Sequence, residues 1–351
     1  MNDGPWTRRK SMSIRKSTRR SGTGRAMNAA LLGSILGGIA LLAGLLRTFL
    51  FVPRRAAPRL NAKVVQDTLI VGEQVRSYLA VIPDDLPPYA PLLLVFHGSN
   101  QNGQGIRTST GYVFDQQAVK HGFLVVYPDA YKGTWNDCRT ASHFPSQQEN
   151  IDDVGLARAL VDHFEASHQI DRSRVYAAGY SNGGQLVFRL ATEASGEFAG
   201  LAAVTATQPT DDNWSCPVPG QPVPILLISG TRDPITPYEG GIVSLFGLQP
   251  RGPARSFVET ARYYAQVNGL PFRPVESELI SKSGMTAVKI SSFTQSGHFP
   301  VVAYSVQGGG HVVPGPASAF PRLMGRIDRD LNAPAVIWAF FAEQAERAGA
   351  R

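Results

Sequence analysis

The chain is poor in cysteine, in charge and, over its first 60 residues, in acidic side chains. Its two cysteines have a spacing that fits no zinc pattern, so we predict no metal site. Charged residues make up 17% of the 351 positions and hydrophobic residues 43%, as in a protein with a sizeable core. Residues 1–60 hold twelve Arg and Lys but one acid, whereas the rest holds 22 basic and 26 acidic residues. The net charge of +7 therefore comes from the N-terminal segment, and the folded part lacks the basic surface that nucleic-acid binding needs.

That N-terminal segment has a basic part and an apolar part. Residues 1–26 combine Arg and Lys with Ser, Thr and Gly, which predicts a disordered cytoplasmic tail. Residues 27–52 are mostly apolar and long enough to cross a bilayer, which predicts a transmembrane signal-anchor helix. The positive charge before this helix would place the body of the protein outside the cytoplasm, in the periplasm or at the cell surface. Cleavage of the segment would make the protein secreted instead.

After a linker at residues 53–61, strand and helix patterns alternate through residues 62–351. Continuous apolar runs such as 92–96 are typical of strands buried on both faces. Helical periodicity runs through 113–121 and 153–168. The alternation predicts an α/β fold with a mostly parallel central sheet flanked by helices. The expected strands are an antiparallel opening pair at 64–71 and 75–82, and buried strands at 92–96, 123–127, 201–204 and 223–228.

A serine flanked by glycines lies between a predicted strand and a predicted helix. The segment is Gly179-Tyr180-Ser181-Asn182-Gly183, and helical character follows it. In this context G-x-S-x-G forms a nucleophile elbow, which holds its serine in a strained backbone conformation. The two glycines leave room for the flanking segments to approach each other closely. We therefore predict that Ser181 is a nucleophile.

Two later segments offer an acid and a base. Asp233 follows a buried strand and a glycine turn, where a triad acid would lie. His311 follows three glycines, which we expect to take positive φ and so bring its imidazole to a crowded centre. The order Ser181, Asp233, His311 is the order of the triad in α/β-hydrolases. Other carboxylates in this region lack so clear a strand before them: Asp211, Asp212 and Glu239.

The polar loop after the predicted strand at 92–96 is the candidate for an oxyanion hole beside Ser181. It can aim backbone N–H groups at an oxyanion, and we predict that the N–H groups of Ser99 and Asn182 form the hole. His97 precedes the serine in the chain and is expected to be a structural hydrogen bonder. Cys138 and Cys216 suggest one disulfide if the domain lies outside the cytoplasm, with two free thiols as the alternative.

Together these motifs resemble the polyhydroxybutyrate depolymerase and feruloyl esterase family, meaning the first carbohydrate esterase family and its relatives. The resemblance covers roughly residues 62–345. It implies the α/β-hydrolase fold and an enzyme that is usually secreted or periplasmic, with Ser181 as nucleophile, Asp233 as acid and His311 as base. One position departs from the family, because Val313 stands where a tryptophan is often found. The motifs are His97-Gly98, Asp152-Asp153-Val154-Gly155, Gly179-Tyr180-Ser181-Asn182-Gly183-Gly184, Gly230-Thr231-Arg232-Asp233 and Gly308-Gly309-Gly310-His311.

The sequence thus predicts a serine carboxylic-ester hydrolase that acts through an acyl-enzyme and needs no cofactor. The expected substrates are hydroxyalkanoate or feruloyl-type esters, either small molecules or polymers. A serine peptidase or an acyltransferase on the same fold remains open, as does a non-catalytic binding protein tethered to the membrane. The expected partners are the ester substrate and, through residues 27–52, the membrane. The oligomeric state stays open.

Overall fold

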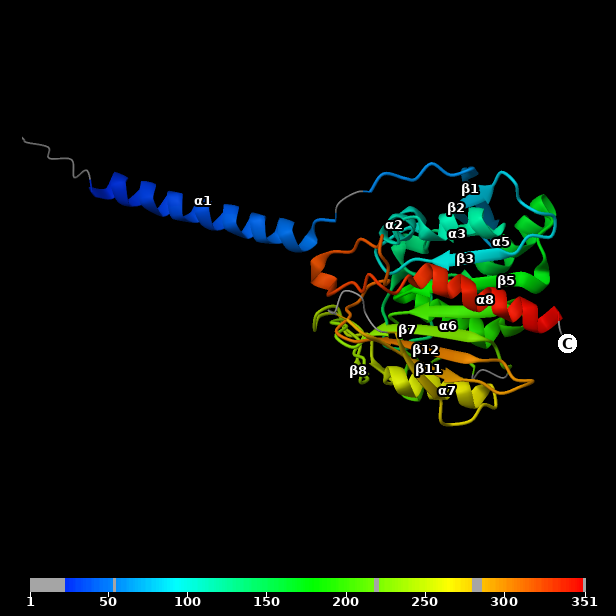
Figure 1. The fold of residues 1–351 in the computed structure, drawn as a ribbon. Helices are drawn as coiled ribbons and strands as arrows, with labels where there is room; N and C mark the ends of the chain where they lie inside the picture. The colour runs from blue at the N-terminus through cyan, green and yellow to red at the C-terminus, as the bar shows by residue number, and fades with distance from the viewer. Residues whose placement is uncertain (1–22, 53–54, 218–220, 280–285, 350–351) are drawn as a thin grey trace, which may run out of the picture. The chain divides into compact units, whose positions relative to one another are not determined.

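A computed structural model describes residues 23–52, 55–217, 221–279 and 286–349 of the chain, whose elements are labelled in Figure 1. The chain divides into two units, residues 1–49 and residues 50–351, and each is described by itself. Most of the predicted basic tail at residues 1–26 lies outside the described residues.

The first unit contains helix α1, Thr23–Leu50. None of the helices in the described part of the chain is long and apolar enough to cross a membrane. The transmembrane anchor predicted at residues 27–52 is therefore not supported.

The second unit is built on a sheet whose described strands number ten, in the order β1-β2-β4-β3-β5-β6-β7-β12-β11-β10. The six strands from β4 to β12 in this order run parallel, and the outer strands pair antiparallel. The strands of this sheet are β1 Ala62–Val71, β2 Gln74–Pro83, β3 Leu92–Phe96, β4 Leu124–Pro128, β5 Val175–Tyr180, β6 Gly200–Val204, β7 Ile225–Gly230, β10 Val275–Leu279, β11 Val288–Phe293 and β12 Val301–Val306. A separate small pair joins β8 Gly241–Ile242 to β9 Pro253–Ala254.

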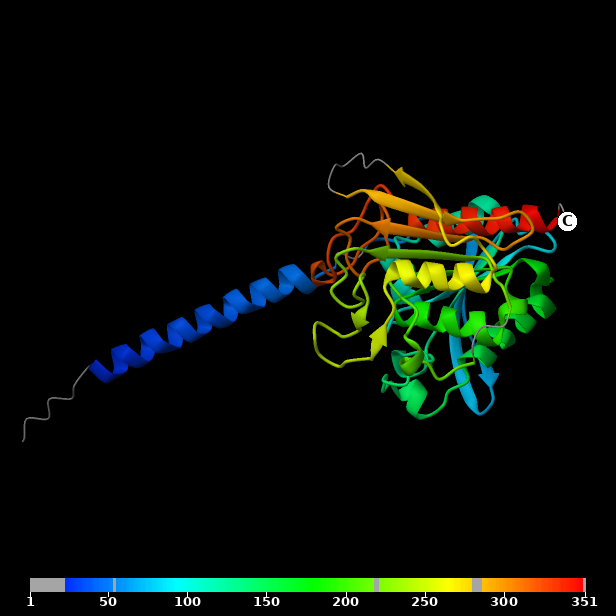
Figure 2. The same ribbon diagram turned by 90° about the horizontal axis from the view of Figure 1, so that it is seen from below.

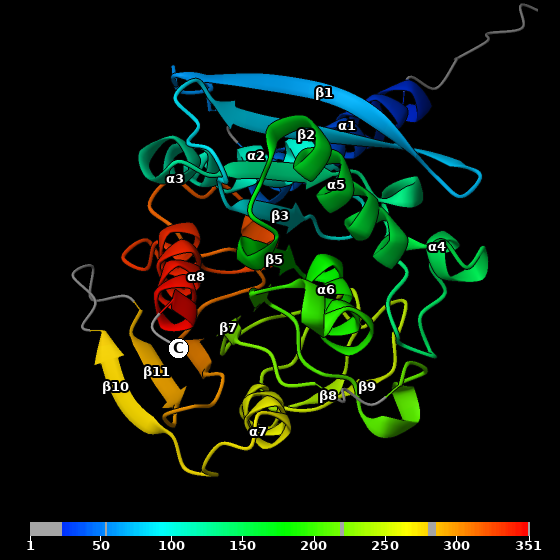
Figure 3. The ribbon, with the colours of Figure 1, turned by 90° about the vertical axis from the view of Figure 1, so that its right-hand side faces the viewer.

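Helices cover both faces of the sheet. Figure 3 shows α5, α6 and α7 on one side and α3 and α8 on the other, and each side buries its own hydrophobic cluster. Helix α7 packs against β7 and β12, as Figure 2 shows from below. The α-helices are α2 Gly103–Ser109, α3 Val113–His121, α4 Pro145–Gln148, α5 Asp153–His168, α6 Asn182–Glu193, α7 Phe257–Val267 and α8 Ala333–Gly349. Short 3₁₀ helices are η1 Tyr131–Gly133, η2 Arg172–Arg174, η3 Ser195–Glu197, η4 Asp211–Asn213 and η5 Arg322–Met324.

The predicted α/β architecture is confirmed. Every residue of β3 is buried, as its continuous apolar run indicates, because helices cover both faces of the sheet there. Helix α5 begins where predicted because the Asp152 carboxylate accepts a hydrogen bond from the N–H of Gly155 at 2.7 Å. The sequence patterns did not predict β12 or the antiparallel strands β10 and β11, which extend the sheet beyond it.

Candidate active site

Ser181 occupies a tight turn between β5 and α6. Its φ of 56° and ψ of −116° place a non-glycine residue in a sparsely populated region of conformational space. The surrounding backbone leaves no room for side chains at the two flanking glycines. A Cβ at Gly179 would lie 2.1 Å from the Gly183 carbonyl oxygen, and a Cβ at Gly183 would lie 2.4 Å from the Phe96 carbonyl oxygen. The turn therefore has the close backbone packing that the motif predicts.

Hydrogen bonds join Ser181, His311 and Asp233 into one chain. The Ser181 Oγ lies 2.8 Å from His311 Nε2, and His311 Nδ1 lies 2.7 Å from Asp233 Oδ2. The other carboxylate oxygen of Asp233 accepts two backbone N–H bonds of 2.8 Å each, from Ile235 and Thr236. A carboxylate fixed on both oxygens holds the imidazole with Nδ1 protonated, which leaves Nε2 free to accept the serine proton.

The sheet brings the acid and the base together. Asp233 follows β7 and His311 follows β12, and these two strands are parallel neighbours whose carboxyl ends meet at one edge. The His311 backbone is fixed on both sides, because its N–H donates to the Met324 carbonyl at 2.6 Å and its carbonyl accepts from the Tyr180 hydroxyl at 2.8 Å.

The three glycines before His311 act mainly through close packing. We expected them to supply positive φ, and among the three only Gly308 has it, at 71°. A Cβ at Gly310 would lie 2.2 Å from the Met324 carbonyl oxygen, and one at Gly309 would lie 2.7 Å from the Val306 side chain. Small residues are therefore required here chiefly because neighbouring segments contact the backbone.

His97 makes the structural hydrogen bonds expected of it. Its buried ring bonds the Gly98 carbonyl through Nδ1 at 2.7 Å, and its Nε2 accepts the Ala130 N–H at 3.0 Å. Burial is the main cause that lowers the pKa of His97 to about 4. Both ring nitrogens are thus occupied by backbone groups, and the ring stays neutral at pH 7.

The two residues predicted for the oxyanion hole lie on either side of the serine turn. A Cβ at Gly98, next to Ser99, would lie 3.3 Å from the Ser181 Cβ, so this loop packs against the nucleophile. Asn182 begins α6 directly after Ser181. Within the described residues, neither the Ser99 N–H nor the Asn182 N–H is assigned a protein acceptor.

A polar network around the Asn182 side chain, directly after Ser181, was not predicted from the sequence. The Asn182 side chain accepts from the Trp135 N–H and donates to Asp137 Oδ2, each at 2.8 Å. Asp137 in turn pairs with Arg139 through two bonds of 3.1 and 2.5 Å, and both side chains are buried. The sign of this network in the sequence is the group of Trp, Asn, Asp and Arg around Cys138. Asn182, to which this group bonds, lies more than 40 residues further along the chain. This network holds the first residue of α6 in place.

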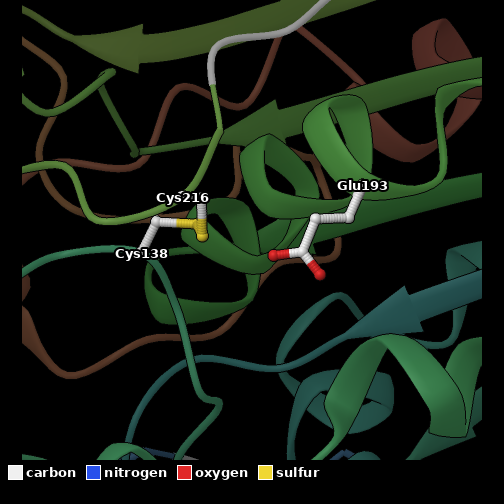
Figure 4. Close-up of side chains that lie close together, drawn as sticks. All are labelled: Cys138, Glu193 and Cys216. Atoms are coloured by element: carbon white, nitrogen blue, oxygen red, sulfur yellow. A yellow bond between two sulfur atoms is a disulfide. The ribbon is translucent and has the colours of Figure 1, made fainter.

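The predicted disulfide joins Cys138 to Cys216, whose Cα atoms are 5.4 Å apart. Figure 4 shows Glu193 beside the two sulfurs, and the three side chains are close enough together to be considered as metal ligands. Sulfurs bonded to each other are not thiolates, so we assign no metal to this cluster. The bond ties the loop of the Asn182 network to the segment after η4.

A narrow pocket of about 10 Å³ opens beside the serine. Val313, which departs from the family pattern, is buried in the hydrophobic cluster on the α8 face and does not line this pocket. The lining combines cationic, amide and apolar side chains: Arg139, Ser181, Asn182, Gln185, Thr205, Ile235, Thr236, Val243 and Arg251.

The turn that holds Ser181 lies in a region that matches a known protein family. The model of the dienelactone hydrolase family matches residues 79–241. This region is similar to dienelactone hydrolase family domains. The acetyl xylan esterase from Aspergillus awamori has the same fold, with a TM-score of 0.52 at 16% identity over 72% of this chain and 95% of that one. The α/β-hydrolase fold is thereby confirmed.

Curated relatives are named as esterases. A Nocardia uniformis subsp. tsuyamanensis protein proposed to be an esterase, NocK, is 28% identical over 80% of this chain and 83% of its own length. Feruloyl esterase B of Piromyces equi is 27% identical over 54% of this chain and 34% of its own length. Poly(3-hydroxyalkanoate) depolymerase C of Paucimonas lemoignei is 30% identical over 35% of this chain and 29% of its own length. The family resemblance drawn from the motifs is confirmed, and these relatives support a carboxylic ester hydrolase.

The depressed pKa of His97 predicts a loss of stability in acid. Because the folded pKa of about 4 lies below the ordinary 6.5, the unfolded state binds this proton first as the pH falls. The contribution is full above pH 6.5 and is lost between pH 6.5 and about 4, amounting to about 3 kcal/mol. Urea unfolding at several pH values should show a smaller acid loss for His97→Gln than for the wild type. Parallel pH profiles for the two proteins would contradict this account.

Proposed function

We propose that the chain is a serine carboxylic-ester hydrolase that acts through an acyl-enzyme. The observation that carries the proposal is the hydrogen-bonded series Ser181–His311–Asp233 with its serine in a strained turn. Relatives named as esterases support the reaction class. The assignment of Ser181 as the group that attacks the ester rests on the geometry of these three side chains.

The proposed reaction has two halves. His311 Nε2 takes the Ser181 proton as Oγ attacks the ester carbonyl, and the N–H groups of Ser99 and Asn182 hold the oxyanion. The tetrahedral intermediate collapses when His311 gives that proton to the leaving alcohol. Water, deprotonated by His311, then attacks the acyl-enzyme, which releases the acid and restores Ser181. Asp233 keeps the imidazole in the required tautomer and stabilises its cationic form.

The narrow pocket favours short aliphatic groups. A volume of about 10 Å³ is close to the space that one water molecule needs, so a bulky group on this side requires the lining to move. Two buried aliphatic side chains, Ile235 and Val243, lie on the lining. Of the two substrate classes expected from the sequence, we propose the hydroxyalkanoate esters, because their smaller acyl group requires less movement of this lining than a feruloyl group.

Replacing the nucleophile tests the function directly. In the full-length chain, Ser181→Ala removes the attacking oxygen and should lower kcat/KM by at least about 1000-fold. Turnover is followed with p-nitrophenyl acetate, p-nitrophenyl butyrate, 3-hydroxybutyrate oligomers and methyl ferulate, and the short aliphatic esters should be preferred. The matched control is Ser195→Ala, since Ser195 lies in η3 outside the site, and this variant should keep wild-type turnover.

Equal turnover by Ser181→Ala and the wild type would refute the proposal. A wild type that cleaves acid-matched amides faster than esters would instead indicate a peptidase. Formation of a new ester from an added alcohol, in place of the free acid, would indicate an acyltransferase.

Because Asp233 orients His311, its replacement should lower kcat without unfolding the protein. Asp233→Asn keeps the side-chain shape but favours the wrong tautomer of His311, so kcat should fall by about 10⁴-fold. Asp212→Asn changes an exposed carboxylate of the same region and should leave kcat unchanged. Steady-state kinetics, with circular dichroism to verify folding, measures both variants. A folded Asp233→Asn protein with wild-type kcat would rule out the assigned role.

We also propose that the hydrolase domain lies outside the cytoplasm. The disulfide between Cys138 and Cys216 supports this location, because such bonds persist in oxidising compartments. Cell fractionation with thiol alkylation before lysis should find the protein outside the cytoplasm with both cysteines protected. Recovery of the native protein in the cytoplasm with two alkylated thiols would contradict the proposal.

A further inference from the structure

The pocket beside Ser181 contains two buried arginines in different electrostatic situations. Arg139 is 3% exposed, and its charge is balanced by the two bonds to Asp137. Arg251 is 6% exposed, yet within the described residues its guanidinium is assigned no carboxylate partner and no hydrogen-bond acceptor. The pocket therefore holds one unbalanced positive charge next to the nucleophile.

The backbone of Arg251 is fixed where it enters the pocket. Its N–H donates to the Val243 carbonyl at 2.8 Å, and its carbonyl accepts from the Asn213 side chain at 3.0 Å. The guanidinium carbon lies 4.8 Å from the centre of the Phe144 ring, and that of Arg139 lies 5.9 Å from the same ring. Stacking on an aromatic face holds a guanidinium in place while leaving its edge N–H groups able to bind an anion.

The Arg251 guanidinium is largely buried but still reached by solvent, since none of its nitrogens is both fully buried and without a hydrogen-bond partner. Desolvation is the main cause that lowers the pKa of Arg251 to about 10; the positive charge of Arg139 adds to the effect and the negative charge of Asp137 opposes it. The group still carries its charge at pH 7. A largely desolvated guanidinium that has no carboxylate within ion-pair distance is suited to bind an anion that a substrate brings into this pocket in place of solvent.

We propose that Arg251 binds a carboxylate carried by the ester substrate and so makes the enzyme selective for anionic esters. This inference rests on the proposed function, since it concerns the substrate of the Ser181 site. A planar guanidinium matches a carboxylate with two parallel hydrogen bonds. The carboxylate can belong to the acyl part, as in a dicarboxylic acid monoester, or to the alcohol part, as in an oligomer of a hydroxy acid.

The test compares pairs of esters that differ in one charge. For a carboxylate in the acyl part, the full-length wild type is assayed with p-nitrophenyl hemisuccinate and with p-nitrophenyl butyrate. For a carboxylate in the alcohol part, it is assayed with the 3-hydroxybutyrate dimer and with the methyl ester of that dimer. The carboxylate ester of at least one pair should have the higher kcat/KM. In Arg251→Gln the ratio of kcat/KM within that pair should fall about 10- to 100-fold. Arg251→Lys, which keeps the charge without the planar fork, should retain part of the preference.

The matched control is Arg255→Gln. Arg255 also stacks on an aromatic ring, that of Tyr263 at 5.0 Å, but it pairs with Asp211 and lies outside the pocket lining. This variant should keep the wild-type ratio. A wild type with no preference in either pair, or a folded Arg251→Gln protein with the wild-type ratio, would overturn the proposal and leave Arg251 as a packing residue.

Binding separates this inference from the hydrolase proposal. Calorimetry of the full-length Ser181→Ala protein with butyrate and 3-hydroxybutyrate should show binding of at least one anion. Adding Arg251→Gln should weaken that binding at least about 10-fold. Anion binding through Arg251 in a protein whose wild type hydrolyses no ester would uphold the carboxylate site and refute the hydrolase. If the wild type hydrolyses esters but Arg251→Gln leaves anion binding unchanged, the hydrolase proposal stands and the carboxylate site is refuted.

Discussion

The close contact of three backbone segments at the carboxyl edge of the sheet is the constraint on which the site depends. The end of β5, the start of α6 and the end of β3 approach so closely that neither Gly179 nor Gly183 has room for a Cβ. That packing forces Ser181 to φ 56°, with its hydroxyl toward His311. Strain of this kind persists only where the surrounding structure determines the conformation. Here the buried parallel strands supply that structure.

Charge inside this protein is of two kinds. Arg76 with Asp153 and Arg107 with Asp115 are buried pairs 2.7 Å apart that lie outside the pocket lining. Burial raises the pKa of Asp153 even though Arg76 opposes the shift, so the carboxylate depends on its partners to stay charged. Arg251 differs from these groups, because no described carboxylate lies within ion-pair distance of it and Asp137, which acts on it from further away, is paired with Arg139. The contrast distinguishes charges that hold the fold from a charge suited to a ligand.

Local patterns in the sequence predicted much of this architecture. The run at 92–96 and the helix at 153–168 were predictable because a buried strand and a capped amphipathic helix are recognisable from adjacent residues. The meeting of Ser181, Asp233 and His311 was predictable from their order in the chain and from the strands before Ser181 and Asp233, whereas the strand before His311, β12, was not among the predicted strands. The bond from Asn182 to Asp137 and the position of Arg251 were not, since each depends on loops that meet far apart in sequence.

The central claim is that the hydrogen bond from His311 makes Ser181 nucleophilic. The most direct measurement is the site of attachment of a fluorophosphonate, found by peptide mass spectrometry of the labelled full-length protein, with His311→Ala in parallel. The account predicts that the wild type carries a single adduct on Ser181 and that the adduct forms far more slowly in His311→Ala, because the serine then lacks its base. Labelling at another residue, or equal rates of labelling at Ser181 in both proteins, would contradict it.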